Sequence, residues 1–183
     1  MVTEDALFDA AASLLAARPA ASMDDVARAA GISRATLFRR FPNRSALVAG
    51  LCRQAVGAFV AATDPDPGAE EGDSASAVRA LVARLVPLGA RYGLMATQPL
   101  EELLARDLLE RASAGEERVR ALVRRGQADG SFRVEVDPEW VLTVLTWLVV
   151  GAADGVRLGR LAPARVEAHV ADTVLRLLVR NAG

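Results

Sequence analysis

The chain has 183 residues, enough for one sizeable core or two small ones, and its net charge of −1 argues against general adhesion to nucleic acid. A single cysteine excludes an internal disulfide, and no stretch of eighteen uninterrupted apolar residues is present. We therefore expect a cytoplasmic protein without a membrane partner. Ala, Leu, Val and Arg dominate the composition and favour helices. The predicted fold class is all-α, with about nine helices.

The N-terminal segment predicts three short helices. The first runs from about Glu4 to Ala17, where apolar residues recur at helical spacing. Ser22 and Asp25 then form a capping-box pattern at the start of a second helix. Gly31 supplies a tight turn, and a third helix over Arg34–Arg40 must end before Pro42. Two short helices around a glycine turn are typical of a helix-turn-helix.

The charge distribution of this segment is informative. Residues 26–63 contain no Asp or Glu, although the chain as a whole is slightly acidic. Six arginines fall in this stretch: Arg28, Arg34, Arg39, Arg40, Arg44 and Arg53. A local basic face suits a module that docks one end onto DNA phosphates. A solvated arginine face is the alternative, but the coincidence of turn, caps and basic stretch favours DNA binding.

The pattern AxxxGISxxTLFxxFPNRxxL resembles the DNA-binding signature of TetR-family transcriptional repressors. The resemblance implies that residues 1–45 form a helix-turn-helix DNA-binding domain whose third helix lies in the major groove. It also implies double-stranded DNA as the partner and a repressor function. The predicted DNA-binding residues are Ser22, Ser33, Arg34, Ala35, Thr36, Phe38, Arg39, Arg40 and Arg44.

These residue types suit different contacts with DNA. Arg34 is expected to bind a guanine edge, and Ala35 a thymine methyl group. Arg40 and Arg44 are expected to clamp phosphates. Phe38 stands where the family commonly has tyrosine, and its ring cannot hydrogen-bond a phosphate. Two interpretations of Phe38 remain open: packing under the DNA sugar, or a core position.

Residues 46–183 are predicted to form a helical domain for effector binding and dimerisation, as the resemblance implies. A helix from residue 44 to about residue 62 ties this domain to the first, and a polar loop follows over residues 63–76. The spacing of apolar residues and breakers then predicts helices over residues 77–92, 98–112, 116–128, 138–158 and 163–181.

Residues 140–153 carry no charge, so almost the whole circumference of the helix they form is expected to be covered. A second copy of the chain is one cover, and a central place in a monomer is the alternative. TetR-like proteins pair their last two helices in a dimer, which would bind a pseudo-palindromic operator. The predicted interface residues are Val144, Leu148, Gly151, Gly155, Val166, Val170, Val174 and Leu177.

The resemblance also implies a ligand pocket in the C-terminal domain. The residues predicted to line it are Leu88, Arg91, Tyr92, Met95, Leu103, Arg106, Phe132, Trp140, Thr143 and Trp147. Pro87 is expected to kink its helix and open space nearby. An apolar pocket favours a hydrophobic or aromatic effector. Each of these residues also fits an ordinary core position.

The sequence offers no catalytic or metal-binding pattern. His169 is the only histidine and has no cysteine or carboxylate cluster around it in sequence, so we expect no metal. Cys52 is interpreted as a buried structural thiol, with a redox role as the alternative. No cofactor and no enzymatic activity are expected. The leading hypothesis is a dimeric repressor released by a ligand. A regulator controlled by a protein partner or by abundance, and a helical binding or enzymatic domain with a fortuitous motif, are the alternatives.

Overall fold

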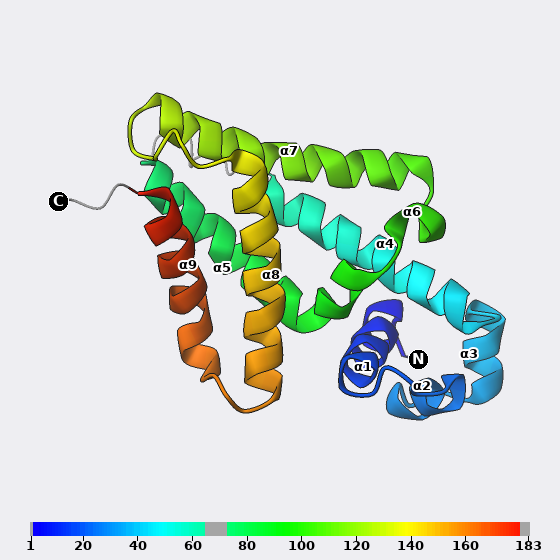
Figure 1. The fold of residues 1–183 in the computed structure, drawn as a ribbon. Coiled ribbons are helices and arrows are strands. Elements are labelled where there is room, and N and C mark those ends of the chain that lie inside the picture. Colours follow the sequence, from blue (N-terminus) through cyan, green and yellow to red (C-terminus); the bar gives the residue numbers. More distant parts are fainter. Residues whose placement is uncertain (1, 65–72, 180–183) are drawn as a thin grey trace.

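The computed structural model describes residues 2–64 and 73–179 (Figure 1). Within these ranges it has nine α-helices, one 3-10 helix and no strand, which confirms the predicted all-α class. The elements are α1 (Glu4–Ala17), α2 (Met23–Ala29), α3 (Arg34–Arg40), α4 (Arg44–Thr63), α5 (Ser74–Tyr92), η1 (Gly93–Thr97), α6 (Leu100–Leu103), α7 (Arg106–Ala128), α8 (Pro138–Arg157) and α9 (Pro163–Leu178). Most of the loop predicted over residues 63–76 lies outside the described residues.

Helices α1 and α3 have the predicted bounds, and α2 begins at the predicted cap, because these signals are local. The backbone N–H of Asp25 donates to the Ser22 hydroxyl over 3.1 Å, and the Ser22 N–H donates to the Asp25 carboxylate over 3.0 Å. This reciprocal pair is the predicted capping box. Gly31 has φ +64, a left-handed conformation that glycine adopts at little cost. Leu7, Leu37 and their neighbours bury the inner faces of these helices in one small core.

A second core joins α5, α7, α8 and α9, and α4 links it to the first (Figure 1). Helices α5 and α8 approach very closely at Gly89. A Cβ atom there would lie 2.4 Å from the Val149 Cγ1 atom and 2.7 Å from the Val149 carbonyl oxygen. Only glycine therefore fits this crossing without displacement of α8.

The helix predicted over residues 98–112 is wrong, and so is the break predicted before the helix over residues 116–128, whose end at residue 128 is confirmed. The chain instead forms η1 and the short α6, bends at residues 104–105, and continues as one long α7. Gly115 lies inside α7 and packs against α4. A Cβ atom on residue 115 would lie 2.8 Å from the Phe59 ring, so a glycine is needed for this close packing. Gly115 therefore permits a close contact between two helices. The last helix, predicted to reach residue 181, ends at Leu178 in the described residues.

By length and composition alone, α4 and α8 are apolar enough to cross a membrane, a property that core helices of soluble proteins share. Helix α4 contacts α5, α6 and α7, so its apolar residues are partly covered within the chain. Helix α8 is less covered, because Trp140 and Trp147 keep 56% and 54% of their surfaces exposed.

Candidate nucleic-acid interface and ligand cavity

Helix α3 presents one face to solvent and holds the other in the N-terminal core. Leu37 is fully buried and anchors the inner face. The nine predicted DNA-binding residues all keep exposed or partly exposed surface. Thr36 donates its backbone N–H to the Ser33 hydroxyl over 3.1 Å, so Ser33 caps the helix. The exposed face of α3 is thus fixed in orientation by a buried leucine and a cap.

Arg34, the first residue of α3, does not extend freely into solvent. Its Nη1 atom donates to the Asp24 carboxylate over 2.7 Å. Its guanidinium also lies over the Phe38 ring, with 5.0 Å between Cζ and the ring centroid. Phe38 is half-buried and forms a platform for Arg34. The role of Asp24 could not be predicted, because no local sequence pattern indicates which acid an arginine ten residues away will contact.

Arg44 has different surroundings from those expected of a free phosphate clamp. Its Nη1 and Nη2 atoms donate to the carbonyl oxygens of Ala21 and Pro19 over 2.6 and 2.5 Å. The guanidinium therefore holds the loop between α1 and α2. Within the described ranges, no carboxylate pairs with Arg39 or Arg40, and both side chains are exposed.

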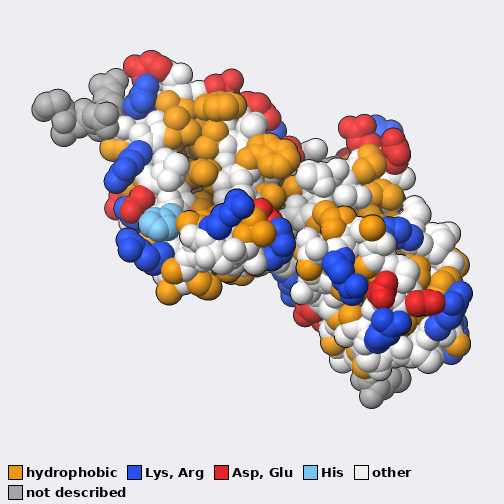
Figure 2. Space-filling view, turned by 60° about the horizontal axis from the view of Figure 1, so that its bottom comes forward, with side chains coloured by type: hydrophobic (Ala, Val, Ile, Leu, Met, Phe, Trp, Pro, Cys, Tyr) orange, Lys and Arg blue, Asp and Glu red, His pale blue; other side chains and the backbone are white. Residues whose placement is uncertain are grey.

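The lobe formed by α1, α2 and α3 carries several arginine side chains with a few acidic ones between them (Figure 2). Two of the acids are already used within the protein, because Asp24 pairs with Arg34 and Asp25 pairs with Arg28. Hydrogen bonds from Ser22 hold the pKa of Asp25 below its ordinary value, so its charge persists. The free arginines give this lobe a positive face suited to phosphate.

A cavity of 230 Å³ lies where the two cores meet. It is bounded by α4, α5, η1, α6, α7 and α8, and apolar side chains form most of its wall. Cys52 of α4 and Met95 of η1 lie together in this wall, with 3.6 Å between the Sγ and Sδ atoms. Burial raises the pKa of the Cys52 thiol to about 11, so the thiol is protonated at neutral pH. Cys52 is buried, as predicted.

Only three of the ten residues predicted to line the pocket do so: Leu88, Tyr92 and Met95. The other seven do not line this cavity; they are Arg91, Leu103, Arg106, Phe132, Trp140, Thr143 and Trp147. Helical phase explains the tryptophans, since Leu142, Leu145 and Val149 face the cavity while Trp140 and Trp147 lie on the outer side of α8.

The other displaced residues have partners elsewhere. Arg91 pairs with Asp9 of α1, Arg106 pairs with Glu110, and Phe132 is buried in the core of the C-terminal helices. Helix α4 contributes a further wall that was not predicted, namely Cys52, Ala55, Val56 and Phe59. Their apolar pattern is the same as that of ordinary core residues, so no sequence signal separates them.

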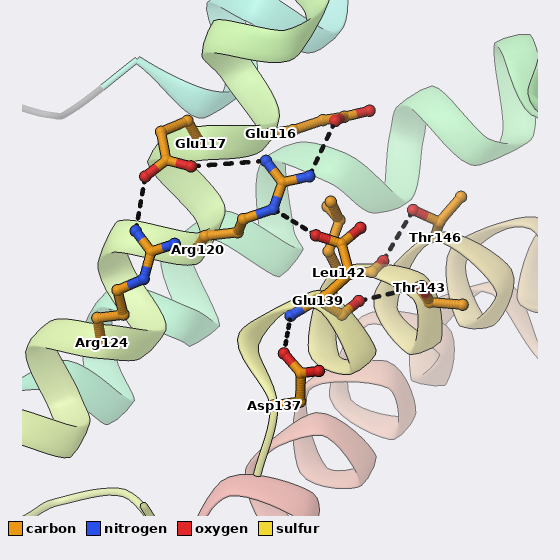
Figure 3. A network of polar contacts seen from close by, with 9 residues as sticks. All are labelled: Glu116, Glu117, Arg120, Arg124, Asp137, Glu139, Leu142, Thr143 and Thr146. Atoms are coloured by element: carbon orange, nitrogen blue, oxygen red, sulfur yellow. Dashed lines mark hydrogen bonds and ion pairs between the residues drawn. The ribbon is translucent and has the colours of Figure 1, made fainter.

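Glu116 alone among the described lining residues carries a charge. Arg120 donates to the carboxylates of Glu116 over 3.2 Å and of Glu139 over 2.6 Å, as Figure 3 shows. Arg120 also pairs with Glu117, which Arg124 contacts over 2.6 Å. This network ties α7 to α8 at the polar edge of the cavity. The Arg124 hydrogen bond holds the pKa of Glu117 below its ordinary value.

Three of the predicted dimer-interface residues are buried within the single chain. Val166, Val170 and Val174 expose only 3, 3 and 1% of their surfaces, because the chain's own core covers them. Gly155 is approached by Leu161 of the same chain, since a Cβ atom there would lie 2.7 Å from the Leu161 Cδ1 atom.

The remaining predicted interface residues keep some surface. Gly151 is exposed with open space around it, and Val144, Leu148 and Leu177 are half-buried. The apolar surface that α8 leaves uncovered centres on Trp140 and Trp147.

Two short helices around a tight turn, with an exposed arginine-bearing helix and a linked helical domain, define a helix-turn-helix DNA-binding regulator. Residues 7–51 match the family model described as bacterial regulatory proteins, tetR family. The chain is 29% identical over 153 residues to the HTH-type transcriptional repressor LfrR of Mycolicibacterium smegmatis, an alignment that covers 82% of this chain and 76% of that protein. Residues 7–51 thus match a tetR-family DNA-binding domain, and the chain is similar over most of its length to a TetR-type transcriptional repressor.

Solved structures show the same fold. LfrR from Mycobacterium smegmatis in complex with proflavine superposes with a TM-score of 0.75 at 24% identity, covering 97% of this chain and 96% of that one. PfmR, a TetR family transcriptional regulator from Thermus thermophilus, gives a TM-score of 0.66 at 25% identity, covering 99% of this chain and 100% of that one.

Proposed function

We propose that this regulator is a cytoplasmic, dimeric repressor that a small apolar or aromatic molecule releases from its operator. One observation carries the proposal: a single cavity touches both α4, which follows directly on the recognition helix α3, and α8, which has an uncovered apolar face. A ligand in that cavity contacts the two elements that determine where the recognition helices of a dimer stand.

The DNA-binding part of the proposal uses α3 in the major groove. Arg34, Ala35 and Thr36 then face base edges, and Arg39 and Arg40 face the flanking backbone. We place the boundary between the DNA-binding and effector domains near residue 45. The N-terminal core reaches further along α4, however, because Leu47 and Leu51 are fully buried in it. Helix α4 is therefore the mechanical link between the two domains.

The dimer is proposed to form on the outer face of α8. Two half-exposed tryptophans one heptad apart make a hydrophobic surface that a lone soluble chain would leave in water. Figure 2 shows a broad hydrophobic area on the lobe that includes α8 and α9. A two-fold dimer presents two copies of α3, which is why the operator is expected to be a pseudo-palindrome.

The effector is proposed to be compact and largely apolar. The cavity of 230 Å³ lies below the roughly 300–1,000 Å³ of sites for drug-sized ligands. A larger ligand would have to push α4 away from α5 and α8. Because α4 follows the recognition helix, this displacement would couple ligand binding to DNA binding. LfrR was solved with proflavine, a flat aromatic molecule, and proflavine is therefore a suitable first probe for this cavity.

The test is a titration of DNA binding with and without proflavine. Footprinting on the DNA flanking the gene supplies the operator, and the protein should protect one pseudo-palindrome. Proflavine should weaken operator binding, and the operator should weaken proflavine binding by the same factor, because linkage is reciprocal. Proflavine, a planar aromatic molecule, also stacks into DNA by itself, so release supports the proposal only where the protein stays folded and release is lost when the cavity is filled by a larger side chain.

Ala112→Phe and Ala114→Phe provide a matched pair of variants on α7. Ala112 lines the cavity, whereas Ala114 is exposed on the same helix. The first substitution should weaken proflavine binding and the second should not. If proflavine and related aromatic compounds bind without any change in operator affinity, control by a protein partner or by abundance becomes the better account.

A further inference from the structure

The Asp24–Arg34 pair carries a second inference about DNA recognition, which rests on the proposed function. The pair connects two helices of the helix-turn-helix, since Asp24 is in the first turn of α2 and Arg34 begins α3. The two side chains are 2.7 Å apart yet keep 46 and 69% of their surfaces exposed. A ligand can therefore reach the pair without any rearrangement of the fold.

We propose that Asp24 is a specificity-determining residue that directs Arg34 towards base edges and away from phosphates. A guanidinium has five N–H donors in a fixed plane, so one bond to Asp24 leaves others for a guanine. The Phe38 ring, 5.0 Å from the Arg34 Cζ atom, fixes the plane from a second side. Arg34 is held by two contacts before it meets DNA.

The charge of Asp24 makes this arrangement selective. In a complex with the correct sequence, Arg34 keeps its bond to Asp24 and also binds the guanine edge. On other sequences, the most favourable contact left to Arg34 is with a phosphate, and Arg34 reaches it by turning away from Asp24. The Asp24 carboxylate is then unpaired beside the negatively charged backbone. Asp24 thus penalises the incorrect complexes more than the correct one, which is how specificity is raised through repulsion.

The neighbouring acid supplies a control. Asp25 has the same charge and lies in the same helical turn, but it caps α2 through Ser22 and pairs with Arg28. If negative charge at the start of α2 mattered only for the helix or for general repulsion of DNA, Asp24 and Asp25 would act alike. If Asp24 acts through Arg34, only its replacement will change sequence discrimination.

The experiment begins with selection of duplexes from a random-sequence library by the full-length protein. Affinities for the selected duplex and for a scrambled duplex are then measured for wild type, Asp24→Asn, Asp25→Asn, Arg34→Ala and the double variant Asp24→Asn/Arg34→Ala. Asp24→Asn should bind the scrambled duplex more tightly and lower the specificity ratio roughly tenfold, the size of one good base contact. The affinity for the scrambled duplex should depend more steeply on salt concentration, by an amount that corresponds to about one additional phosphate contact per subunit.

The double variant decides whether Asp24 acts through Arg34. Without Arg34, the Asp24→Asn change should alter binding of both duplexes equally. An unchanged specificity ratio in Asp24→Asn, or a ratio that falls equally with and without Arg34, would overturn the proposal. Thermal melts check the fold, and Asp24→Ser provides a second variant with a side chain that suits a helix start. Failure of the wild type to select any duplex would instead overturn the proposed repressor function itself.

Discussion

At the scale of single residues, two arginines with the same predicted role have different surroundings. Arg40 is exposed on α3, and the described part of the chain places no acid against it. Arg44 instead donates to two carbonyl oxygens of the loop between α1 and α2. Arg44, four residues after Arg40 in the motif, thus binds the protein itself. Its contribution to stability therefore has to be measured separately from its contribution to DNA binding.

Replacement of each arginine by alanine separates these roles. Arg44→Ala should lower the free energy of unfolding by about 1 kcal/mol, because two carbonyl groups lose a charged donor. Arg40→Ala should leave stability within ~0.5 kcal/mol and should reduce the salt dependence of DNA binding by about one contact per subunit. Urea unfolding and salt titrations measure the two effects. An Arg44→Ala protein with unchanged stability but a reduced salt dependence would mean that Arg44 exchanges the carbonyls for phosphates.

The residues that could be predicted from sequence are those whose partners are close in sequence. Ser22 meets Asp25 three residues away, and Gly31 and Pro42 act on the backbone where they stand. The Asp24–Arg34 contact spans ten residues, and the Arg44–Pro19 contact spans twenty-five. Such contacts depend on how whole helices cross, which no local pattern contains. The same reason explains why the cavity wall on α4 was missed.

At the scale of elements, close crossings position the helices around the cavity. Gly115 lets α7 lie against α4, and Gly89 lets α5 lie against α8. Both glycines occur inside helices, where sequence alone suggests a weak point or an end. A small residue that permits contact and a small residue that ends a helix look identical until the neighbouring helix is in place. The positions of Trp140, Thr143 and Trp147 outside the cavity have a similar origin, because the phase of α8 follows from the α5 crossing.

The α5–α8 crossing makes a prediction about Gly89. Gly89→Ala should destabilise the protein by roughly 1–3 kcal/mol, because the new methyl group overlaps Val149 and forces α8 outwards. The same substitution at Gly57, inside α4 with no atom within 4 Å of the new Cβ, should stabilise by about 0.5–1 kcal/mol. Urea unfolding compares the two variants. Equal effects at both positions would mean that helix propensity rather than the crossing governs Gly89.

At the scale of the whole molecule, the two cores and the cavity between them form a path from the outer face of α8 to the recognition helix. The cavity wall includes Val149 and Val150 of α8 and Cys52 and Val56 of α4. Movement of either helix therefore alters the space available to a ligand, and a ligand alters both helices. In a dimer built on α8, each subunit would transmit such a shift to the spacing of the two α3 helices.

The role of the α8 face can be tested at Trp147. Its side chain is 54% exposed in the single chain, so Trp147→Arg should leave the fold intact while placing a charge in the proposed interface. Sedimentation should then report a monomer, and operator affinity should fall by roughly 10²–10⁴-fold, because the two half-sites are no longer bound together. Trp147→Phe keeps an apolar ring and should remain dimeric with near-normal affinity. A Trp147→Arg protein that still sediments as a dimer would place the contact on another face, and the spacing of the α3 helices would then not be set through α8.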